Sequence, residues 1–367
     1  MFRVFERDFA GESPLYQRLS GLLAERTDLA TPLLSAPHGQ RRALLLFAAV
    51  QQILRVREPG HRLAEWYPSL GGTRSPHDPA LLPAFADLVH QHQAEITEWC
   101  RSRTTQTNEV RRAALLRPAL GFAADLVPGP LALIELGCSA GLLLVPDRYA
   151  FRYYNADRSV TYGTGYEVDC EARGAAWPAA ASLPIVVGSR IGIDLAPVRP
   201  SDTDGVNWLR SCIWPEHLDR VARLDAAIEV VAEAAPPMIA GNFVDELAPV
   251  LDAVPPDQVP CVFTSHALAY LRSSERGALL RLWDAVGRTR DLIVIVNENP
   301  IVGLHAFAPD AVADDDLKTP VTAVVWRDGQ PTVTVLAHGG PHGNYLIYGP
   351  WQYAYDPPLL RTEAATD

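Results

Sequence analysis

The sequence predicts an α/β protein in which a mostly parallel sheet follows a helical domain, and three observations support this. After Pro130, apolar runs alternate with amphipathic helical segments, which is typical of parallel strands joined by crossovers. Before residue 127, the apolar residues have helical spacing and show no strong strand signal. Near the end, two β-rich segments flank a short turn at 327–331, which predicts an antiparallel hairpin. We therefore expect a helical domain over residues 1–127 and an α/β domain over residues 128–367.

Four helical segments are expected in the first domain, because their apolar residues recur every three or four positions. They lie at Leu15–Leu23, Arg42–Val56, Leu81–Ile96 and Leu115–Leu126. The segment Pro128-Gly-Pro130 then breaks the pattern and separates the two predicted domains.

Five apolar runs are the strand candidates of the second domain. They are Leu131–Leu136, Ile185–Ile193, Pro237–Ala240, Cys261–Thr264 and Leu292–Val296. The other elements expected in this domain are helices at Leu218–Ala234 and Ser274–Val286 and hairpin strands at Val321–Trp326 and Thr332–Ala337. Residues 146–184 contain Gly163, Gly165 and Gly174, and are expected to form an irregular insertion with one candidate strand at Phe151–Asn155.

Composition narrows the possible functions. The chain has 43 acidic and 32 basic residues, and its net charge of -11 argues against a general nucleic-acid binder, which needs clustered positive charge. No apolar run reaches the ~18 residues of a membrane span, and the charged start does not resemble a signal peptide. The five widely spaced cysteines form no disulfide framework or metal motif and indicate a reducing cytoplasm. We expect a cytoplasmic protein that acts on a small molecule without a metal; no oligomeric state follows from the sequence.

A buried strand, a glycine turn and the start of a helix are predicted at Leu131–Val145. Gly137 and Gly141 bracket the turn, and Leu142–Val145 are expected to begin the helix. Two chemistries fit this pattern. A nucleotide-like ligand can lie over the turn, because small residues let the backbone approach it closely. Alternatively Ser139 is a nucleophile, because residues 137–141 also match G-x-S-x-G.

Polar residues follow all five strand candidates. In chain order they include Glu135, Asp194, Asn242, His266 and Glu298. Ligands of open parallel sheets bind at the carboxyl ends of the strands, so these residues predict a polar cleft there. Any one of them is explained as readily by a helix cap, but five in succession favour a site.

Residues 135–141, Glu-Leu-Gly-Cys-Ser-Ala-Gly, resemble the first motif of class I S-adenosylmethionine-dependent methyltransferases, E-x-G-x-G-x-G. The resemblance implies a Rossmann-like sheet and S-adenosylmethionine as the cofactor. It also implies that Gly137 and Gly141 line the methionine part, while Glu135 orients the turn. Ser139 stands where that family usually has its middle glycine. The C-terminal hairpin is similar to the sheet edge of the same family.

The same resemblance assigns roles to two of the polar strand ends. Asp194 would lie near the ribose hydroxyls, and Asn242 would lie near the adenine ring. These two residues complete the cofactor site that the resemblance implies.

A polar segment at residues 101–112 separates two apolar helical runs. One interpretation is a solvated loop that caps the next helix. The other is a lid over the cleft, in which Arg103, Gln106, Asn108 and Glu109 contact the substrate.

Taken together, the motifs resemble a bacterial family known only as domain-of-unknown-function family 2332. They are Arg103…Gln106-Thr-Asn-Glu109, Glu135-x-Gly-x-Ser-Ala-Gly141, Asp147-Arg-Tyr149, Arg190-x-Gly-x-Asp-x-x-Pro197, Trp208-Leu…Trp214-Pro215 and His342-Gly343. The resemblance covers nearly the whole chain. Since the name of the family implies no activity, the function has to be argued from the site.

Methyl transfer from S-adenosylmethionine to a small molecule is the function we expect. The reaction is a direct displacement that depends on alignment, and a general base adds about 10²–10⁴-fold when the acceptor is a hydroxyl or amine. His266 is the first candidate base because the ordinary pKa of histidine lies near neutrality, and Glu109 and Glu298 follow. Two alternatives remain. Ser139 favours a binding or regulatory module that has lost catalysis, whereas a serine hydrolase using Ser139 is disfavoured by the helical region before the motif.

Overall fold

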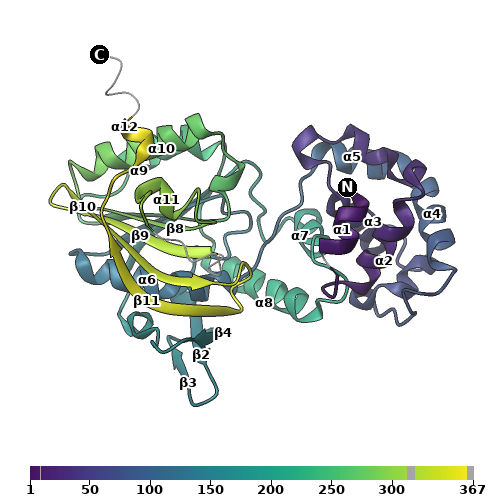
Figure 1. The fold of residues 1–367 in the computed structure, drawn as a ribbon, viewed down its shortest axis with the longest axis horizontal. Coiled ribbons are helices and arrows are strands. Elements are labelled where there is room, and N and C mark those ends of the chain that lie inside the picture. The colour runs from purple at the N-terminus through teal and green to yellow at the C-terminus, as the bar shows by residue number, and fades with distance from the viewer. Residues whose placement is uncertain (9, 312–318, 362–367) are drawn as a thin grey trace. The chain divides into compact units, whose positions relative to one another are not determined.

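The structure, a computed structural model, describes residues 1–8, 10–311 and 319–361. The chain divides into two compact units (Figure 1). The first unit consists of residues 1–108 and 199–225, and the second consists of residues 109–198 and 226–367. The predicted division at residue 127 therefore differs from the observed units, because residues 109–127 join the α/β unit and residues 199–225 join the helical one.

Helices build the first unit. They are α1 (Phe2–Asp8), α2 (Pro14–Leu23), α3 (Ala43–Val56), α4 (Leu81–Gln91), α5 (Gln93–Ser102) and α7 (Thr203–Ser211), with 3-10 turns at Thr27–Ser35, His38–Gln40, Arg62–Trp66 and Pro68–Leu70. The expected single helix at Leu81–Ile96 is two helices, because the backbone of His92 (φ -114°, ψ 22°) leaves the helical region between α4 and α5.

Buried polar contacts explain why residues 199–225 belong to the first unit. The amide of Gln51 on α3 donates to the carbonyl oxygens of Arg210 and Ile213, both at 3.1 Å. Arg210 lies in the last turn of α7 and Ile213 lies two residues after its end, so these bonds tie α3 to the end of α7. Glu216 accepts hydrogen bonds from the Ser13 hydroxyl and the Leu15 N–H at 2.6 and 2.8 Å.

An eleven-stranded sheet is the centre of the second unit. Its strands are β1 (Leu131–Leu136), β2 (Tyr149–Tyr154), β3 (Ser159–Tyr162), β4 (Tyr166–Arg173), β5 (Val187–Asp194), β6 (Met238–Ala240), β7 (Val259–Ser265), β8 (Leu292–Asn297), β9 (Thr319–Arg327), β10 (Gln330–Gly339) and β11 (Tyr345–Tyr353). They lie in the order β3-β2-β4-β11-β10-β9-β8-β7-β1-β5-β6. Most neighbouring pairs are parallel, and β8, β9, β10 and β11 are antiparallel to one another in turn. The predicted α/β fold class is confirmed.

Helices cover both faces of this sheet. Helix α6 (Arg112–Leu126) lies on one face, and α9 (Phe243–Asp252) and α10 (Ser273–Gly287) lie on the other (Figure 1). The unit also contains α11 (Leu304–Phe307) and α12 (Pro358–Arg361), and α8 (Leu218–Ala234) contributes residues to both units. On the α9 and α10 face, alternate residues of β1 pack into one apolar core, since Ala132, Ile134 and Leu136 are all buried there.

The chain order in the middle of the sheet marks a ligand-binding position. Strands β6-β5-β1-β7-β8 have the doubly wound arrangement, in which the chain winds to one side of β1 and then returns to the other. In such sheets the crevice forms at the carboxyl ends of the strands where the winding direction changes. Here that position is the carboxyl end of β1, next to β5 and β7.

The C-terminal hairpin is confirmed, and a third strand extends it. Strands β9 and β10 pair through Arg327 and Gln330, which flank a two-residue turn. Asp328 (φ 50°) and Gly329 (φ 74°) both have positive φ, as the favoured type I′ hairpin turn requires.

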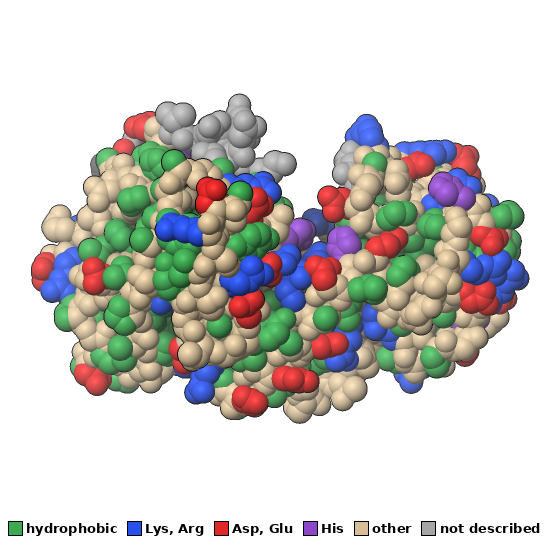
Figure 2. Space-filling view, turned by 90° about the horizontal axis from the view of Figure 1, so that it is seen from below, with side chains coloured by type: hydrophobic (Ala, Val, Ile, Leu, Met, Phe, Trp, Pro, Cys, Tyr) green, Lys and Arg blue, Asp and Glu red, His purple; other side chains and the backbone are tan. Residues whose placement is uncertain are grey.

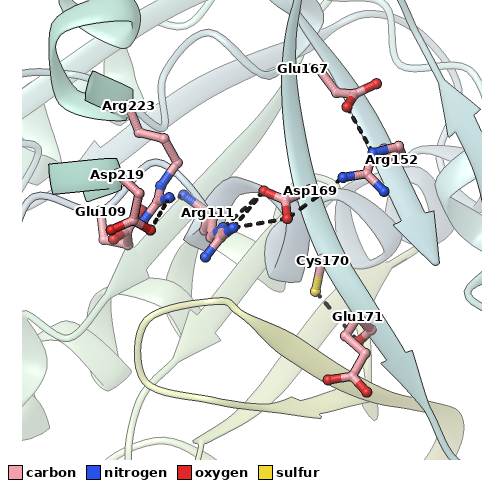
Figure 3. A network of polar contacts seen from close by, with 9 residues as sticks. All are labelled: Glu109, Arg111, Arg152, Glu167, Asp169, Cys170, Glu171, Asp219 and Arg223. Atoms are coloured by element: carbon pink, nitrogen blue, oxygen red, sulfur yellow. Dashed lines mark hydrogen bonds and ion pairs between the residues drawn. The ribbon is translucent and has the colours of Figure 1, made fainter. Parts of the chain in front are cut away.

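The insertion predicted as irregular contains three strands, β2, β3 and β4. Strand β4 pairs with β11, so this insertion forms the far end of the same sheet. Arg111, one residue before α6, holds it with a forked ion pair to Asp169 on β4 at 2.8 Å (Figure 3). Arg152 on β2 continues the alternation of charge by pairing with Glu167 at 2.7 Å. Ion pairs therefore hold the insertion in place in addition to the backbone hydrogen bonds between β4 and β11.

The surface carries charges of both signs. On the face in Figure 2, acidic and basic side chains are interspersed, with no large field of one sign. Within the described part of the chain, no helix combines the length and apolar character needed to cross a membrane.

Candidate functional site

The turn after β1 has an unusual backbone. Gly137 (φ 75°), Ser139 (φ 49°) and Gly141 (φ 70°) adopt the left-handed conformation at alternate positions. This conformation costs a non-glycine residue roughly 1–2 kcal/mol, so Ser139 is held in the shape that glycine adopts most readily. The turn keeps a three-glycine geometry although its middle residue is serine.

Hydrogen bonds fix this turn to the end of β5. The N–H of Gly137 donates to the Ile193 carbonyl at 2.8 Å. The N–H of Ser139 donates to Oδ2 of Asp194 at 2.9 Å, and Oδ1 of Asp194 accepts from the N–H of Ala196 at the same distance. The carboxylate of Asp194 therefore clamps the turn to the loop that follows β5.

Alternate residues of β5, at positions 190, 192 and 194, contact the segment 137–147 that contains the turn. Arg190 forms a forked ion pair with Asp147, at 2.7 and 2.9 Å. A Cβ atom at Gly192 would lie 2.5 Å from the sulfur of Cys138, so a side chain cannot fit there. Together with Asp194, these residues explain the Arg190-x-Gly-x-Asp motif as one side of a strand that receives residues 137–147.

The helix expected after the turn does not form. Leu142–Val145 form no helix, all four are buried, and a 3-10 turn at Pro146–Arg148 leads directly into β2. An apolar run of four residues that ends at a proline is too short to build a helix with one exposed face. The prediction of a helix at this position was wrong, and no helix N-terminus faces a ligand from this side of the turn.

The loop after β7 packs against the same turn. A Cβ atom at Gly137 would lie 2.6 Å from the Cβ of Ala267, so the two segments are in close contact. Oε1 of Glu298, at the end of β8, accepts hydrogen bonds from the N–H groups of Ala267 and Leu268, at 2.5 and 2.8 Å. Asn297 accepts from the Ser265 hydroxyl at 3.0 Å. The polar residues that follow β8 thus hold the β7 loop against the glycine turn.

His266 lies in this loop in a left-handed conformation (φ 58°), and it is half-buried. Burial, with the nearby charges of Arg112 and His342, lowers its pKa to about 3. A histidine with this pKa is neutral at physiological pH and accepts a proton poorly, so the reason for choosing it as the base does not hold in this environment. Its Nε2 is buried and has no hydrogen-bond partner among the described residues.

Glu298 is completely buried, and burial raises its pKa to about 7, although the N–H groups of Leu268 and Ala267 and the charge of Arg112 oppose the shift. Its second oxygen, Oε2, accepts no hydrogen bond from the residues described. A carboxyl group that is held in this way positions the loop, and a catalytic role for Glu298 stays a prediction. We therefore regard Glu298 as a positioning residue.

Replacing Glu298 by glutamine is expected to flatten the pH dependence of folding stability between about pH 4.5 and 7. The folded-state pKa of about 7 exceeds that of an unfolded glutamate, so the folded state binds the extra proton in this range. Stability from this group is greatest at acid pH and falls as pH rises through the folded pKa, by on the order of 1–3 kcal/mol. Urea denaturation at several pH values measures this slope. Glu233→Gln, at an exposed position, is the control, and equal slopes in wild type and Glu298→Gln would contradict the raised pKa.

Glu135 points away from the apolar core on the α9 and α10 face, because its neighbours Ile134 and Leu136 lie in that core. It is 3% exposed, and burial followed by the charge of Asp194 raises its pKa well above the ordinary value. This environment suits an orienting residue inside the turn more than a solvated acid.

Arg112, at the start of α6, is a member of this group that the sequence interpretation missed. It is buried, and its Nε donates to the Pro341 carbonyl at 2.9 Å. Its charge affects the pKa values of both His266 and Glu298, so its guanidinium lies close to the strand ends. Two consecutive arginines before an apolar helix were the available sequence signal.

The other predicted residues lie in several places. Glu109 is buried in the α/β unit, and its Oε1 accepts from the Arg111 N–H at 3.2 Å. Asn242 caps α9, where its Oδ1 accepts from the Val244 N–H at 3.0 Å. Arg103 belongs to the helical unit, where it pairs with Asp204 and lies 5.0 Å from the centre of the Trp208 ring.

The remaining two predicted substrate contacts, Gln106 and Asn108, also belong to the helical unit and are half-buried. The structure therefore brings the predicted cofactor residues of β1 and β5 into direct contact and does so within one unit. The predicted substrate residues 103, 106 and 108 fall in the other unit, and their role stays a prediction.

Comparison with known proteins gives a family and little more. The family described as "Uncharacterized protein conserved in bacteria (DUF2332)" matches residues 1–347. No curated protein matches the chain significantly. Among solved structures, the chain is similar to the CcbJ methyltransferase from Streptomyces caelestis, with 15% identity over 68% of this chain and 73% of that one. The TM-score is 0.21, which is too low to support any argument about the site.

Proposed function

The chain belongs to DUF2332, a bacterial family described only as uncharacterised, and from that premise we propose a function on the geometry of the site. We propose that the protein binds S-adenosylmethionine over the glycine turn after β1 and transfers the methyl group to a small molecule. The observation that carries this proposal is the left-handed backbone at Gly137, Ser139 and Gly141, at the carboxyl end of β1 where the winding of the sheet changes direction.

The turn and the residues at the ends of β5 and β6 fit the cofactor in three respects. Gly137, Ser139 and Gly141 would line its methionine part, because their small side chains let a ligand approach the backbone. Asp194 would hold the ribose hydroxyls, since each of its oxygens accepts one backbone N–H and a carboxylate oxygen can accept a second hydrogen bond. Asn242 would lie towards the adenine, with its amide nitrogen as a donor.

When bound, the cofactor would supply a methyl group on a positively charged sulfur. The chain contributes alignment, and the clamp of Asp194 and the support of Glu298 fix the two loops that would border the acceptor. Such a displacement depends on alignment of the nucleophile, the methyl group and the sulfur more than on covalent help from the protein. Because its pKa is low, His266 is neutral at physiological pH. In this form its imidazole can donate a hydrogen bond to the substrate or accept one from it.

Calorimetric titration of the full chain tests cofactor binding. We expect S-adenosylmethionine and S-adenosylhomocysteine to bind with dissociation constants below about 1 mM. This limit corresponds to a binding free energy of about −4 kcal/mol. Adenosine and methionine serve as controls for partial recognition. If neither S-adenosylmethionine nor S-adenosylhomocysteine gives heat of binding at concentrations near about 1 mM, the cofactor assignment is contradicted.

Replacing Ser139 by glycine is expected to raise the free energy of unfolding by about 0.5–1 kcal/mol, because relief of left-handed strain outweighs the added freedom of the unfolded chain. S-adenosylmethionine affinity should be kept. Ser139→Ala, which removes the hydroxyl but keeps the strain, is the control. Thermal and urea denaturation measure the first effect and calorimetry the second; a loss of stability in Ser139→Gly would contradict the strain.

Ser139→Gly also distinguishes a serine hydrolase from a methyltransferase, because it removes the proposed nucleophile. A nucleophile elbow places its serine between a strand and a helix, and residues 142–145 form no helix, which weighs against that alternative. A fluorophosphonate probe should leave the wild type unlabelled. Labelling that Ser139→Gly abolishes would favour a hydrolase over methyl transfer.

A non-catalytic binding module is the second candidate. The specific observation in its favour is that burial leaves His266 with a pKa of about 3 and closes off Glu298, so neither is a ready base. Binding of S-adenosylmethionine without transfer to any of a panel of hydroxyl, amine and thiol acceptors would favour this candidate.

A further inference from the structure

Exposed apolar side chains mark the edge of the sheet at which the glycine turn lies. In the described part of the α/β unit, the three most exposed large apolar side chains are Leu195, Tyr270 and Ile301, which are 76%, 67% and 76% exposed. They follow β5, β7 and β8, whose carboxyl ends lie at the same edge as that of β1 because these neighbouring strands are parallel. Single exposed apolar residues are common on proteins, so the shared position of these three is the informative feature.

Tyr270 and Ile301 lie on the side of β1 that the proposed cofactor leaves open. Asp194 and Asn242, which would hold the ribose and the adenine, follow β5 and β6. Strands β7 and β8 lie on the opposite side of β1. A methyl acceptor has to approach the same turn, so the loops after β7 and β8 are the ones left to border it.

Both loops are fixed by the fold. Leu268 and Val302 are buried in the apolar core on the α9 and α10 face. Oδ1 of Asn299 accepts from the N–H groups of Ile301 and Val302, at 3.1 and 3.3 Å, and Tyr270 ends a 3-10 turn that begins at Leu268. The exposed side chains therefore belong to ordered loops, and they offer a ligand an aromatic ring and a branched alkyl chain.

The titratable side chains at these strand ends are poor acceptors of a proton. Glu135 and Glu298 are buried, and one oxygen of each has no hydrogen-bond partner among the described residues. Nε2 of His266 is enclosed in the same way, and burial with the charges of Arg112 and His342 lowers the pKa of this imidazole to about 3. An acceptor that is already deprotonated at neutral pH needs none of these groups as a base.

Carboxylates meet this condition. A carboxyl group in water has a pKa of about 4, so it is ionised at physiological pH, whereas hydroxyls, thiols and amines are mostly protonated. The charge of Arg112 acts in the same direction. It opposes protonation of His266, and for the same reason it favours an anion beside that residue.

We propose that the methyl acceptor is an organic acid with an apolar body, which packs against Tyr270 and Ile301 and is methylated on its carboxylate. This inference rests on the function proposed above. One carboxylate oxygen supplies the electron pair of the new C–O bond to the methyl carbon, and the pair of the breaking C–S bond stays on sulfur. The products are a methyl ester and S-adenosylhomocysteine, and no proton is transferred.

The test measures transfer of tritium-labelled methyl groups from S-adenosylmethionine by the full chain. Phenylacetate, indoleacetate and octanoate are the probe acids, and acetate is the acid without an apolar body. We expect methyl esters of the probe acids, which are recognised because alkali releases their label as volatile methanol. The kcat/KM of the best probe acid should exceed that of acetate by roughly 10- to 100-fold. Phenylethanol and phenylethylamine share the skeleton of phenylacetate and should give no product.

Tyr270→Ser and Ile301→Ser test the apolar contact. Each should lower kcat/KM for the best probe acid by roughly 3- to 10-fold, mainly through KM, and leave that for acetate unchanged. Val186→Ser is the matched control, because Val186 is 62% exposed but lies just before β5, at the opposite edge of the sheet. S-adenosylmethionine affinity and melting temperature should equal those of the wild type in all three variants, since the replaced side chains are exposed.

The outcomes separate this inference from the function on which it rests. If S-adenosylmethionine binds but label passes to the alcohol or the amine, or to none of the probe acids, the inference is overturned and the cofactor assignment stands. It is also overturned if both loop variants melt lower than Val186→Ser and methylate acids as the wild type does, because the two side chains then pack against another part of the protein. If S-adenosylmethionine does not bind, calorimetry contradicts the cofactor assignment before any acceptor is added.

Discussion

Alanine at Gly137 is expected to abolish binding of S-adenosylmethionine and to lower the free energy of unfolding by roughly 2–5 kcal/mol. Two costs add at this position. A side chain at φ 75° is strained by roughly 1–2 kcal/mol, and its Cβ would lie 2.6 Å from the Cβ of Ala267. The second contact forces the turn and the β7 loop apart, so the site itself is displaced.

Gly141→Ala is the matched control for this prediction. Gly141 has nearly the same φ, 70°, but the nearest atom to an added Cβ, the sulfur of Met238, lies at an ordinary 3.4 Å. Gly141→Ala should therefore lower the free energy of unfolding only by the backbone strain that it introduces, about 1–2 kcal/mol. Urea denaturation and calorimetric titration measure both variants, and equal losses would show that contact with Ala267 is unimportant.

Alanine at Asp194 is expected to weaken S-adenosylmethionine binding by at least about 10-fold and to cost about 2–4 kcal/mol of stability. The variant leaves the N–H groups of Ser139 and Ala196 without their acceptor and releases the turn from β5. Asp194 is half-buried, so solvent weakens its two hydrogen bonds. The loss of stability should therefore be smaller than the loss expected for two fully buried hydrogen bonds to a charged group.

Two further variants make the Asp194 result specific. Asp194→Asn keeps one acceptor oxygen and should give an intermediate loss. Asp202→Ala removes another carboxylate that accepts a backbone N–H, from Gly205 at 2.9 Å, but in the helical unit. It should cost about 1 kcal/mol and leave cofactor affinity unchanged. If Asp194→Ala binds the cofactor as tightly as Asp202→Ala does, Asp194 has no part in the site.

Strands β1, β7 and β8 were predictable because buried strands are nearly continuous apolar runs, and β1 has the predicted bounds, whereas β5 and β6 are partly exposed. The insertion was not, because β4 gains its partner from β11, far along the chain, and local glycines hide its period. The helix after Gly141 was predicted from an apolar run whose end at Pro146 limits it to four residues. Local patterns therefore gave the centre of the sheet and missed its far end.

The site shows the same limit. Acidic and small residues at the ends of β1 and β5 indicated the turn. The carboxylate of Asp194 does contact it, by accepting the backbone N–H of Ser139. The pKa of His266 depends on burial and on Arg112, which approaches from α6, and no local pattern contains this information. Sequence spacing identifies residues at one sheet edge, whereas protonation depends on what packs over them.

Pairing of β4 with β11 has a consequence for how the chain acquires its structure. Glu171 and Tyr345 are neighbours in the ladder, yet nearly half of the chain lies between them. During synthesis, residues 149–173 therefore emerge long before the strand that completes their edge. Contacts of such long sequence separation slow folding, so the insertion should be the last part of the sheet to gain protection from hydrogen exchange. At the far end of this sheet, we therefore expect strands that are translated early to be protected late.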